Sequence, residues 1–285
     1  MKAVLTIAGS DSSGGAGIQA DLKTIAAHHL FGESVITALT AQNTLGVTGV
    51  LEVDPVFVGT QIDAVFDDIR PDAVKIGMVS SPAIVGAIAD GLDRHKAANV
   101  VVDPVMVATS GSALIADAAV DALVRQLFPR TSVITPNIPE AEVLSGMAIA
   151  SLEDVETAAS LIADRCIAVW ENEPAFADAA PSVPAILIKG GHGMGEPDAA
   201  DDYLRMASGE SVWLRGKRIT NDNTHGTGCS LSSAIACGLA RGFAVDVAVR
   251  DAKAYVAGAL AAGLNLGRGS GPLDHMWQYG APMPC

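Results

Sequence analysis

The first place in the sequence where chemistry is expected is a glycine-rich turn in front of an apolar stretch. Asn223-Thr224-His225-Gly226-Thr227-Gly228-Cys229-Ser230 directly precedes the run Leu231–Cys237, which favours a helix. A helix N-terminus binds anions through unpaired N–H groups and the helix dipole, and glycine lets a phosphate approach the backbone. The same pattern also fits an ordinary capped turn. It is not a P-loop, because no Lys follows the glycines, and Gly14–Gly17 gives no dinucleotide fingerprint.

Cys229 lies in the first turn of this expected helix. The positive end of the helix dipole favours a thiolate and can lower a thiol pKa from about 8.5 toward neutrality. A thiolate there could accept a proton from an attacking hydroxyl group. The alternative is a small, buried apolar side chain, which is what a lone cysteine more commonly is.

Two further segments carry groups suited to phosphate chemistry. Thr135-Pro136-Asn137-Ile138-Pro139-Glu140 ends a strand and begins a helix, and its amide and carboxylate oxygens suit Mg²⁺ held mainly through water and phosphate. An Asn cap with a Glu near the helix start is the alternative. Lys189, followed by Gly190-Gly191-His192-Gly193, is a cation at a strand end that could neutralise a transferring phosphate or could be a solvated loop residue.

A regular alternation of strands and helices has to position these groups. Short β-branched runs alternate with Ala- and Leu-rich stretches of helical length, which predicts an α/β fold with a mainly parallel sheet. The strands are expected at Val4–Ile7, Val35–Leu39, Val74–Ile76, Val100–Val102, Val133–Thr135 and Ile186–Ile188. Polar or glycine residues follow most of them, and in such sheets ligands bind beyond the carboxyl ends of the strands. The functional residues are therefore expected at one edge.

Composition excludes several classes of protein. The 285 residues are 49% hydrophobic and 18% charged, enough for a sizeable core, and we expect one domain over residues 1–285. The net charge of −14 without a basic cluster argues against nucleic acid as a partner. Four cysteines without metal-ligand spacing indicate neither a disulfide framework nor a zinc site. No 18-residue apolar span or signal peptide is present, so we expect a cytoplasmic protein with no membrane partner.

Three segments in the second half of the chain are less regular. After a helix expected to end near Cys166, residues 168–184 contain acids and prolines without a clear period and are expected to form a surface insertion. Tyr203-Leu204 and Val212-Trp213-Leu214 resemble a hairpin. The final glycine-rich turn is expected to open a long Ala-rich helical region through Leu264.

Together, these motifs resemble the ribokinase-like superfamily, in which a Gly-x-Gly-Asp turn forms an anion hole and Asn-x-x-Glu organises Mg²⁺. Here Cys229 replaces the Asp. The segments Ala8–Lys23 and Val35–Thr44 closely resemble the hydroxymethylpyrimidine/phosphomethylpyrimidine kinases of thiamine biosynthesis. Four shorter segments match in order: Lys75-Ile76-Gly77-Met78, Asp103-Pro104-Val105-Met106, Lys189-Gly190-Gly191-His192 and Thr224–Cys229. The resemblance implies a ribokinase-like three-layer sandwich with a mainly parallel central sheet and helices on both faces.

The resemblance also assigns roles to individual residues. It implies that the pyrimidine pocket is lined by Gly9, Asp21, Gln42, Met78 and Val105. It implies that transfer involves Cys229 as the base, Lys189, and the amides of Gly226, Thr227 and Gly228. ATP would contact Asn137, Lys189, Thr224, Gly226 and Gly228, and Mg²⁺ would bind near Asn137 and Glu140, mostly through water.

The implied activity is ATP-dependent phosphorylation of hydroxymethylpyrimidine and of its monophosphate, in a protein expected by analogy to be a homodimer. Two other readings stay open at this point. Pyridoxal is also a small aromatic heterocycle with a hydroxymethyl group, so a pyridoxal or pyridoxine kinase is possible. A non-catalytic pyrimidine-binding protein is the other, although such a protein has no need of Asn137, Glu140, Lys189 and Cys229 together.

Overall fold

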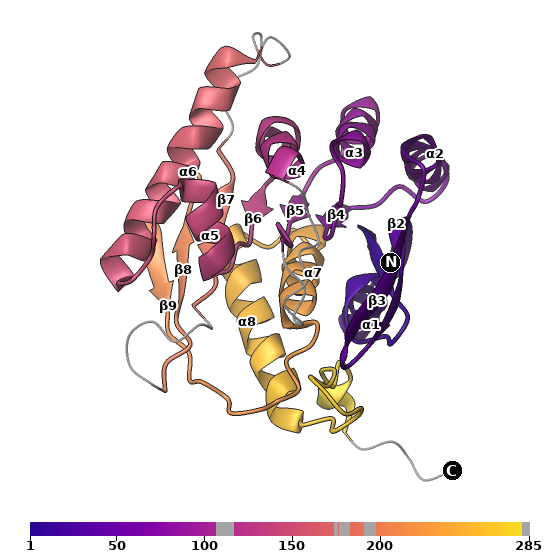
Figure 1. The fold of residues 1–285 in the computed structure, drawn as a ribbon, viewed down its shortest axis with the longest axis vertical. Helices are drawn as coiled ribbons and strands as arrows, with labels where there is room; N and C mark the ends of the chain where they lie inside the picture. The colour runs from indigo at the N-terminus through magenta and orange to yellow at the C-terminus, as the bar shows by residue number, and fades with distance from the viewer. Residues whose placement is uncertain (107–116, 174–175, 177–182, 191–197, 281–285) are drawn as a thin grey trace.

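A twisted sheet lies at the centre of the computed structural model, which describes residues 1–106, 117–173, 176, 183–190 and 198–280 (Figure 1). Within these ranges nine strands join in the order β3-β2-β1-β4-β5-β6-β7-β8-β9. Their bounds are β1 Ala3–Asp11, β2 Phe31–Asn43, β3 Gly46–Glu52, β4 Ala73–Ile76, β5 Val100–Val102, β6 Val133–Ile134, β7 Ala185–Ile188, β8 Asp202–Arg205 and β9 Ser211–Leu214. The six strands from β2 to β7 in this order run parallel, and β3, β8 and β9 are antiparallel additions at the two edges.

Helices cover both faces of the sheet, as expected for a parallel sheet (Figure 1). The described helices are α1 Gly17–Ala27, α2 Pro55–Phe66, α3 Pro82–Arg94, α4 Asp117–Ala122, α5 Ile138–Ser145, α6 Leu152–Asn172, α7 Thr227–Ala240 and α8 Val245–Ala262. Helices α2 to α6 pack in one apolar cluster, and α1, α7 and α8 pack in the other. The expected three-layer arrangement is therefore confirmed.

The strands divide their side chains between these two clusters by simple alternation. In β5, Val100 and Val102 face the α2–α6 side while Val101 faces the other, and all three are buried. In β7, Ile186 and Ile188 face the α2–α6 side, and Ala185 and Leu187 face the other side. This two-residue period is why runs of β-branched residues without polar positions predicted the buried strands correctly.

The edges of the sheet differ from the prediction. The strand expected at Val35–Leu39 is the middle of the 13-residue β2, which turns back at Asn43–Gly46 into β3. Strand β3 was not predicted, because its residues are largely exposed and show no apolar face. The hairpin expected around Tyr203 and Trp213 is confirmed as β8 and β9, with Tyr203 opposite Trp213.

Two helix boundaries also differ. The long helical region expected through Leu264 is two helices, because Gly242 adopts a left-handed backbone conformation (φ 85°) that ends α7 and starts a turn into α8. The helix expected to end near Cys166 continues as α6 to Asn172. The first part of the expected insertion is thus helical, and Trp170 packs against Phe176, with ring centroids 4.4 Å apart. Residues 174–175 and 177–182 of that insertion lie outside the described residues.

A buried ion pair joins the sheet to the α1 and α7 layer. The Nζ atom of Lys75 on β4 lies 2.8 Å from Oδ2 of Asp21 on α1, and both side chains are fully buried. Thr6 Oγ1 of β1 and Ser233 Oγ of α7 donate to the same carboxylate at 2.6 Å and 2.8 Å. The carboxylate thus connects four elements, and all of its described partners are donors, as a buried charge requires.

Breaking this pair should be costly. Replacement of Lys75 by Met leaves the Asp21 carboxylate buried without its cation, and should lower the free energy of unfolding by about 3–5 kcal/mol. The exposed pair Lys2–Asp72 is the matched control, with Nζ and Oδ1 2.7 Å apart, and Lys2→Met should cost less than about 1 kcal/mol. Urea unfolding monitored by circular dichroism measures both. Equal small losses would mean that the buried pair adds nothing.

Candidate active site

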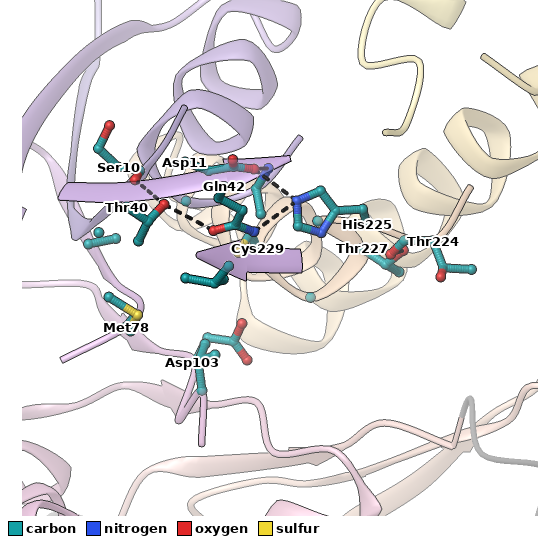
Figure 2. Close-up of a pocket in the computed structure, with 18 of the residues that line it drawn as sticks. Ser10, Asp11, Thr40, Gln42, Met78, Asp103, Thr224, His225, Thr227 and Cys229 are labelled. Atoms are coloured by element: carbon teal, nitrogen blue, oxygen red, sulfur yellow. Dashed lines mark hydrogen bonds and ion pairs between the residues drawn. The ribbon is translucent and has the colours of Figure 1, made fainter. Parts of the chain in front are cut away.

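The carboxyl ends of the parallel strands and the start of α7 enclose one pocket of about 180 Å³ (Figure 2). Its walls come from the ends of β1, β2, β4, β5 and β7, from the start of α5, and from the turn before α7. Of the residues predicted from the sequence, it brings together Gly9, Gln42, Met78, Val105, Asn137, Glu140, Lys189, Thr224, Gly226, Thr227, Gly228 and Cys229. The prediction that strand ends converge on one site is therefore correct.

The start of α7 offers groups that are suited to binding an anion. Gly226 is the N-cap residue with φ 84°, and no side-chain hydrogen bond caps this end and no acidic residue lies in its first turn. The first amides of a helix have no intrahelical acceptor, so those of Gly228 and Cys229 are suited to oxygen atoms of a phosphate. The carbonyl of Thr224 accepts from the backbone N–H and the hydroxyl group of Thr227, which fixes the turn.

Lys189 places a positive charge beside this turn. Its Nζ atom donates to Oδ1 of Asp103 at 2.8 Å and lies 3.9 Å from Oε2 of Glu140. A Cβ atom added at Gly228 would lie 3.4 Å from that Nζ and 3.2 Å from Asp103 Oδ2, so the ion pair adjoins the helix start. Although burial opposes the charge, the two carboxylates raise the pKa of Lys189, and the ammonium group stays protonated.

Asn137 and Glu140 form a reciprocal cap at the start of α5. Asn137 Oδ1 accepts from the backbone N–H of Glu140 at 2.9 Å, and Glu140 Oε2 accepts from the N–H of Asn137 at 2.7 Å. Burial raises the pKa of Glu140 to about 7, with the charge of Lys189 acting against it. The helix-cap alternative is therefore realised, and it leaves both side chains on the wall of the pocket.

The opposite end of the pocket is suited to a small ring. A Cβ atom added at Gly9 would lie 2.7 Å from Cε of Met78, so the thioether lies directly over the glycine. Val105 lines the same pocket, and Gln42 supplies an amide from the end of β2. Thioether and aliphatic groups suit ring faces, and an amide can donate and accept along a ring edge.

Residues 11–274 match the family described as phosphomethylpyrimidine kinase. The hydroxymethylpyrimidine/phosphomethylpyrimidine kinase of Rhizobium meliloti is 48% identical over 278 residues, which covers 96% of this chain and 97% of that protein. This chain belongs to the phosphomethylpyrimidine kinase family.

Solved structures place the family's fold beside that of pyridoxal kinases. The phosphomethylpyrimidine kinase of Clostridium difficile is 42% identical and matches with a TM-score of 0.74, covering 90% of this chain and 98% of that one. The ADP complex of Bacillus subtilis pyridoxal kinase is 32% identical with a TM-score of 0.85, covering 99% and 100%. The ribokinase-like fold implied by the motifs is confirmed, and the chain is a kinase by family.

The structure corrects the expectation for Asp21. Its carboxylate does not line the pocket: it is fully buried on the inner face of α1 and is taken up by Lys75, Thr6 and Ser233. The reason is the helical period, since Asp21 shares the buried face of α1 with Ile18 and Ile25. Asp21 acts on the pocket through Lys75, which lies on its wall, and through its negative charge, which raises the pKa of the Cys229 thiol.

Cys229 also differs from expectation. Burial raises the pKa of its thiol to about 11, although the charge of Lys75 and a hydrogen bond from the backbone of Gly17 act in the opposite direction. Removal from water therefore outweighs the helix dipole that was expected to lower this pKa. In the free protein at neutral pH the group is a thiol, placed on the pocket wall beside the anion turn.

Three charged side chains of the pocket were not predicted as site residues. Asp103 holds Lys189, Lys75 neutralises Asp21, and Asp11 accepts from His225 at 2.8 Å. Asp103 directly follows the all-valine strand β5, and a carboxylate at that position of a parallel sheet was the available signal. The role of His225 could not be predicted from the sequence, because its partner Asp11 lies 214 residues away. Gly191 and His192 of the matched motif lie outside the described residues.

Gly226 lies so close to the loop after β1 that it leaves no room for a side chain. A Cβ atom at Gly226 would lie 1.9 Å from the carbonyl oxygen of Gly15, whereas none of the described atoms lies within 4 Å of one at Gly242, which has nearly the same φ (84° and 85°). Gly242→Ala should lower the free energy of unfolding by about 1 kcal/mol through backbone strain alone. Gly226→Ala should cost about 1–3 kcal/mol more from overlap.

Denaturation of both variants and their kinase activity measure this difference. Gly242→Ala should keep its activity, because Gly242 lies at the far end of α7. Gly226→Ala should lose most of its kcat/KM for ATP, since the turn must open to admit the methyl group. Equal costs for the two variants would contradict the close contact.

Proposed function

We propose that this chain catalyses ATP-dependent phosphorylation of 4-amino-5-hydroxymethyl-2-methylpyrimidine, and of its monophosphate to the diphosphate, in thiamine biosynthesis. One observation carries the proposal: a single pocket joins an anion-binding helix start and Lys189 at one end to Gly9, Gln42, Met78 and Val105 at the other. A phosphate donor and a small ring can therefore meet within it. The family match and the relatives' names support the same reaction.

The pyrimidine would bind at the end lined by Met78 and Val105. These side chains would contact the ring faces, and Gln42 would pair with the ring nitrogen and the neighbouring exocyclic amine through one acceptor and one donor. The hydroxymethyl group would then point toward Cys229 and the start of α7. ATP would lie with its phosphates against Gly226, Gly228 and Thr224, reaching toward Asn137 and Lys189.

Transfer would proceed by in-line attack of the hydroxymethyl oxygen on the γ-phosphorus. A bond forms from that oxygen to phosphorus, the hydroxyl proton passes to the thiolate of Cys229, the bond from phosphorus to the β,γ-bridging oxygen breaks, and ADP leaves. The amides of Gly226, Gly228 and Cys229 and the ammonium group of Lys189 stabilise the transferring group. The amide of Thr227 was expected to join them, but it donates to the carbonyl group of Thr224. In the second reaction a phosphate oxygen of the monophosphate is the nucleophile. It is already anionic, so a base matters less.

The donor set near the anion turn fits Mg²⁺ held mainly by phosphate and water. Asp103 and Glu140 supply two carboxylates there, and Asn137 an amide. Within the described parts of the chain no three His, Cys, Asp or Glu side chains form a metal-binding group. Mg²⁺ commonly uses one or two carboxylates together with substrate phosphates. Bound in this way, the ion would neutralise negative charge on the phosphates.

We also propose a homodimer that acts in the cytoplasm. Leu39 of β2 and Leu51 of β3 lie opposite each other and are 46% and 66% exposed, and Val56 and Phe57 at the start of α2 are also exposed. Neighbouring apolar side chains of this kind suit a contact with a second copy. Cys166, Cys229 and Cys237 are free thiols, as is usual in a reducing compartment. No helix among the described residues is long and apolar enough to cross a bilayer. A monomer in sedimentation equilibrium would contradict the dimer.

Release of ADP with three acceptors tests the function and its nearest alternative. Hydroxymethylpyrimidine, its monophosphate and pyridoxal are offered separately with ATP and Mg²⁺. We expect turnover of both pyrimidines. The similarity to pyridoxal kinases makes pyridoxal the necessary third acceptor, and turnover of pyridoxal without turnover of the monophosphate would overturn the proposal. Nucleotide binding with no ADP release from either pyrimidine would favour a binding protein.

Cys229→Ala tests the base. We expect a loss of about 100-fold or more in kcat for hydroxymethylpyrimidine, in the range for a general base, and a much smaller loss for the monophosphate. Because the thiol pKa is about 11, the thiolate fraction rises about tenfold per pH unit between pH 7 and 10. The wild-type kcat/KM for hydroxymethylpyrimidine should rise with pH in this window and the variant's should not. Equal losses in both reactions, with parallel pH profiles, would exclude the base role.

A further inference from the structure

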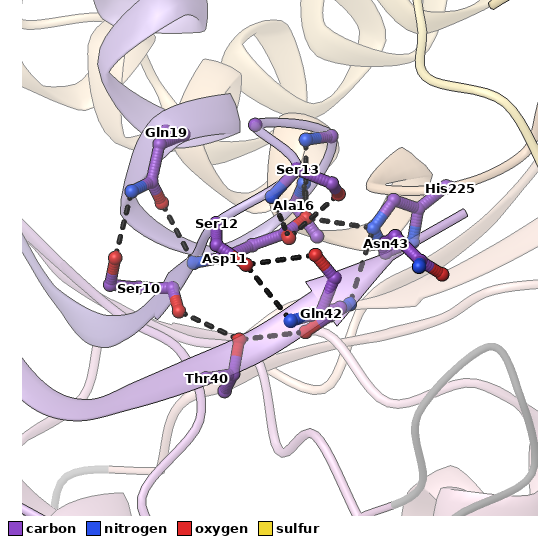
Figure 3. A network of polar contacts seen from close by, with 12 residues as sticks. Ser10, Asp11, Ser12, Ser13, Ala16, Gln19, Thr40, Gln42, Asn43 and His225 are labelled. Carbon is purple, nitrogen blue, oxygen red and sulfur yellow. Dashed lines mark hydrogen bonds and ion pairs between the residues drawn. The ribbon is translucent and has the colours of Figure 1, made fainter. Parts of the chain in front are cut away.

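The side chain of Gln42 is held between two polar groups that lie outside its own turn. As placed, its Oε1 lies 3.0 Å from Thr40 Oγ1 and its Nε2 lies 3.3 Å from Nε2 of His225 (Figure 3). Its backbone is fixed as well, since Ser12 Oγ accepts from the N–H of Gln42 and donates to its carbonyl group. The amide therefore has little freedom except exchange of its oxygen and nitrogen, and its hydrogen-bonding neighbours decide between these two orientations.

His225 decides one end of the amide. Its Nε2 lies 2.8 Å from Oδ2 of Asp11, which also accepts from the backbone N–H groups of Gly15 and Ala16, while Oδ1 accepts twice from Ser13. Although burial opposes it, this set of donors holds the pKa of Asp11 well below its usual range. An ionised carboxylate only accepts, so His225 Nε2 carries the hydrogen atom. A protonated Nε2 has no lone pair that could accept a hydrogen bond from an amide N–H group. The Gln42 atom that faces it must therefore be the oxygen.

Thr40 decides the other end independently. Its hydroxyl group lies 2.9 Å from the carbonyl oxygen of Ser10 and has a single hydrogen atom to donate. Since a carbonyl oxygen can only accept, the hydroxyl group donates to Ser10 and accepts from Gln42. The Gln42 atom facing Thr40 must be the nitrogen. Both neighbours therefore require the same exchange of the two amide atoms.

The imidazole that imposes this choice is itself held in place. Its side chain is 8% exposed, and a Cβ atom added at Gly15 would lie 2.4 Å from its Cδ2. The Cδ2 edge of the ring therefore points at Gly15 at close range, which holds the ring in place beside Gln42. Figure 2 shows Gln42 between Thr40 and His225 at the edge of the pocket.

We propose that His225 is a positioning residue that, with Thr40, fixes which end of the Gln42 amide donates and which accepts, and so selects 4-aminopyrimidines over 4-oxopyrimidines. One N–H and one lone pair of the amide remain for a ligand. A 4-aminopyrimidine offers a ring-nitrogen acceptor beside an amine donor. Its 4-oxo analogue offers an N–H donor beside an oxygen acceptor, which is the reverse order. The selectivity rests on the proposed function, whereas the amide orientation does not.

Binding selectivity tests the proposal. Affinities for hydroxymethylpyrimidine and its 4-oxo analogue are measured by calorimetry without ATP on wild type, His225→Phe and Thr40→Val. Wild type should prefer the amino compound by about tenfold or more, since a reversed pair leaves polar groups unsatisfied. Each variant removes one of the two constraints on the amide, and the preference should fall at least fivefold. Ser12→Ala, which touches only the backbone of Gln42, should weaken both ligands alike and keep the ratio.

A measurement on the free protein separates this inference from the proposed function. In ¹⁵N spectra near pH 8, His225 Nε2 should carry hydrogen, and one Gln42 side-chain N–H should shift in Thr40→Val. An unprotonated Nε2, or unchanged ratios in both His225→Phe and Thr40→Val, would overturn the proposal. If the spectra agree but wild type binds neither pyrimidine, the proposed function fails and the fixed amide stands. If His225→Phe does not fold, Thr40→Val alone decides, since it removes only the hydroxyl group.

Discussion

The pocket depends on how closely two turns approach each other. The loop after β1 and the turn before α7 are separated by more than 200 residues, yet there is no room for a side chain at Gly226 above Gly15, or at Gly15 beside His225. Asp11 joins the same segments through His225 and also organises its own loop through Ser13, Gly15 and Ala16. One carboxylate thus holds the start of α7 against the loop after β1, and the closeness of the two turns explains why small residues occupy this contact.

The charges of the site follow a similar logic in an acidic protein. A chain with a net charge of −14 can bind anionic phosphates only where cations are concentrated locally. Lys75 and Lys189 provide them, and each is held by a carboxylate at 2.8 Å, from Asp21 and Asp103 respectively. Buried ammonium groups need such partners, because an unpaired charge would lose its proton or destabilise the fold. The pairs keep both lysines charged before any ligand arrives.

The sequence predicted the parts of the fold that depend on local pattern. Buried strands follow from β-branched runs such as Val100–Val102, and the anion turn follows from Gly226 and Gly228 before an apolar helix. Roles that depend on tertiary packing were harder to predict from the sequence. Asp21 was assigned to the pocket by the family resemblance, although its helical spacing from Ile18 and Ile25 places it on the buried face of α1. The exposed β3 carries no apolar alternation. The pKa of Cys229 depends on desolvation by distant elements, so a dipole argument alone gave the wrong direction.

The replacement of Asp by Cys at position 229 becomes intelligible within this charge arrangement. The thiol lies near Asp21 and Asp103, whose negative charges raise its pKa, while Lys75 lowers it. A carboxylate at the same position would add a third negative charge to two carboxylates and two lysines, and would compete with phosphate for Lys189. A neutral thiol leaves the balance of the two ion pairs undisturbed. The cost is a proton that must leave before the sulfur can accept another, as the proposed base role of Cys229 requires.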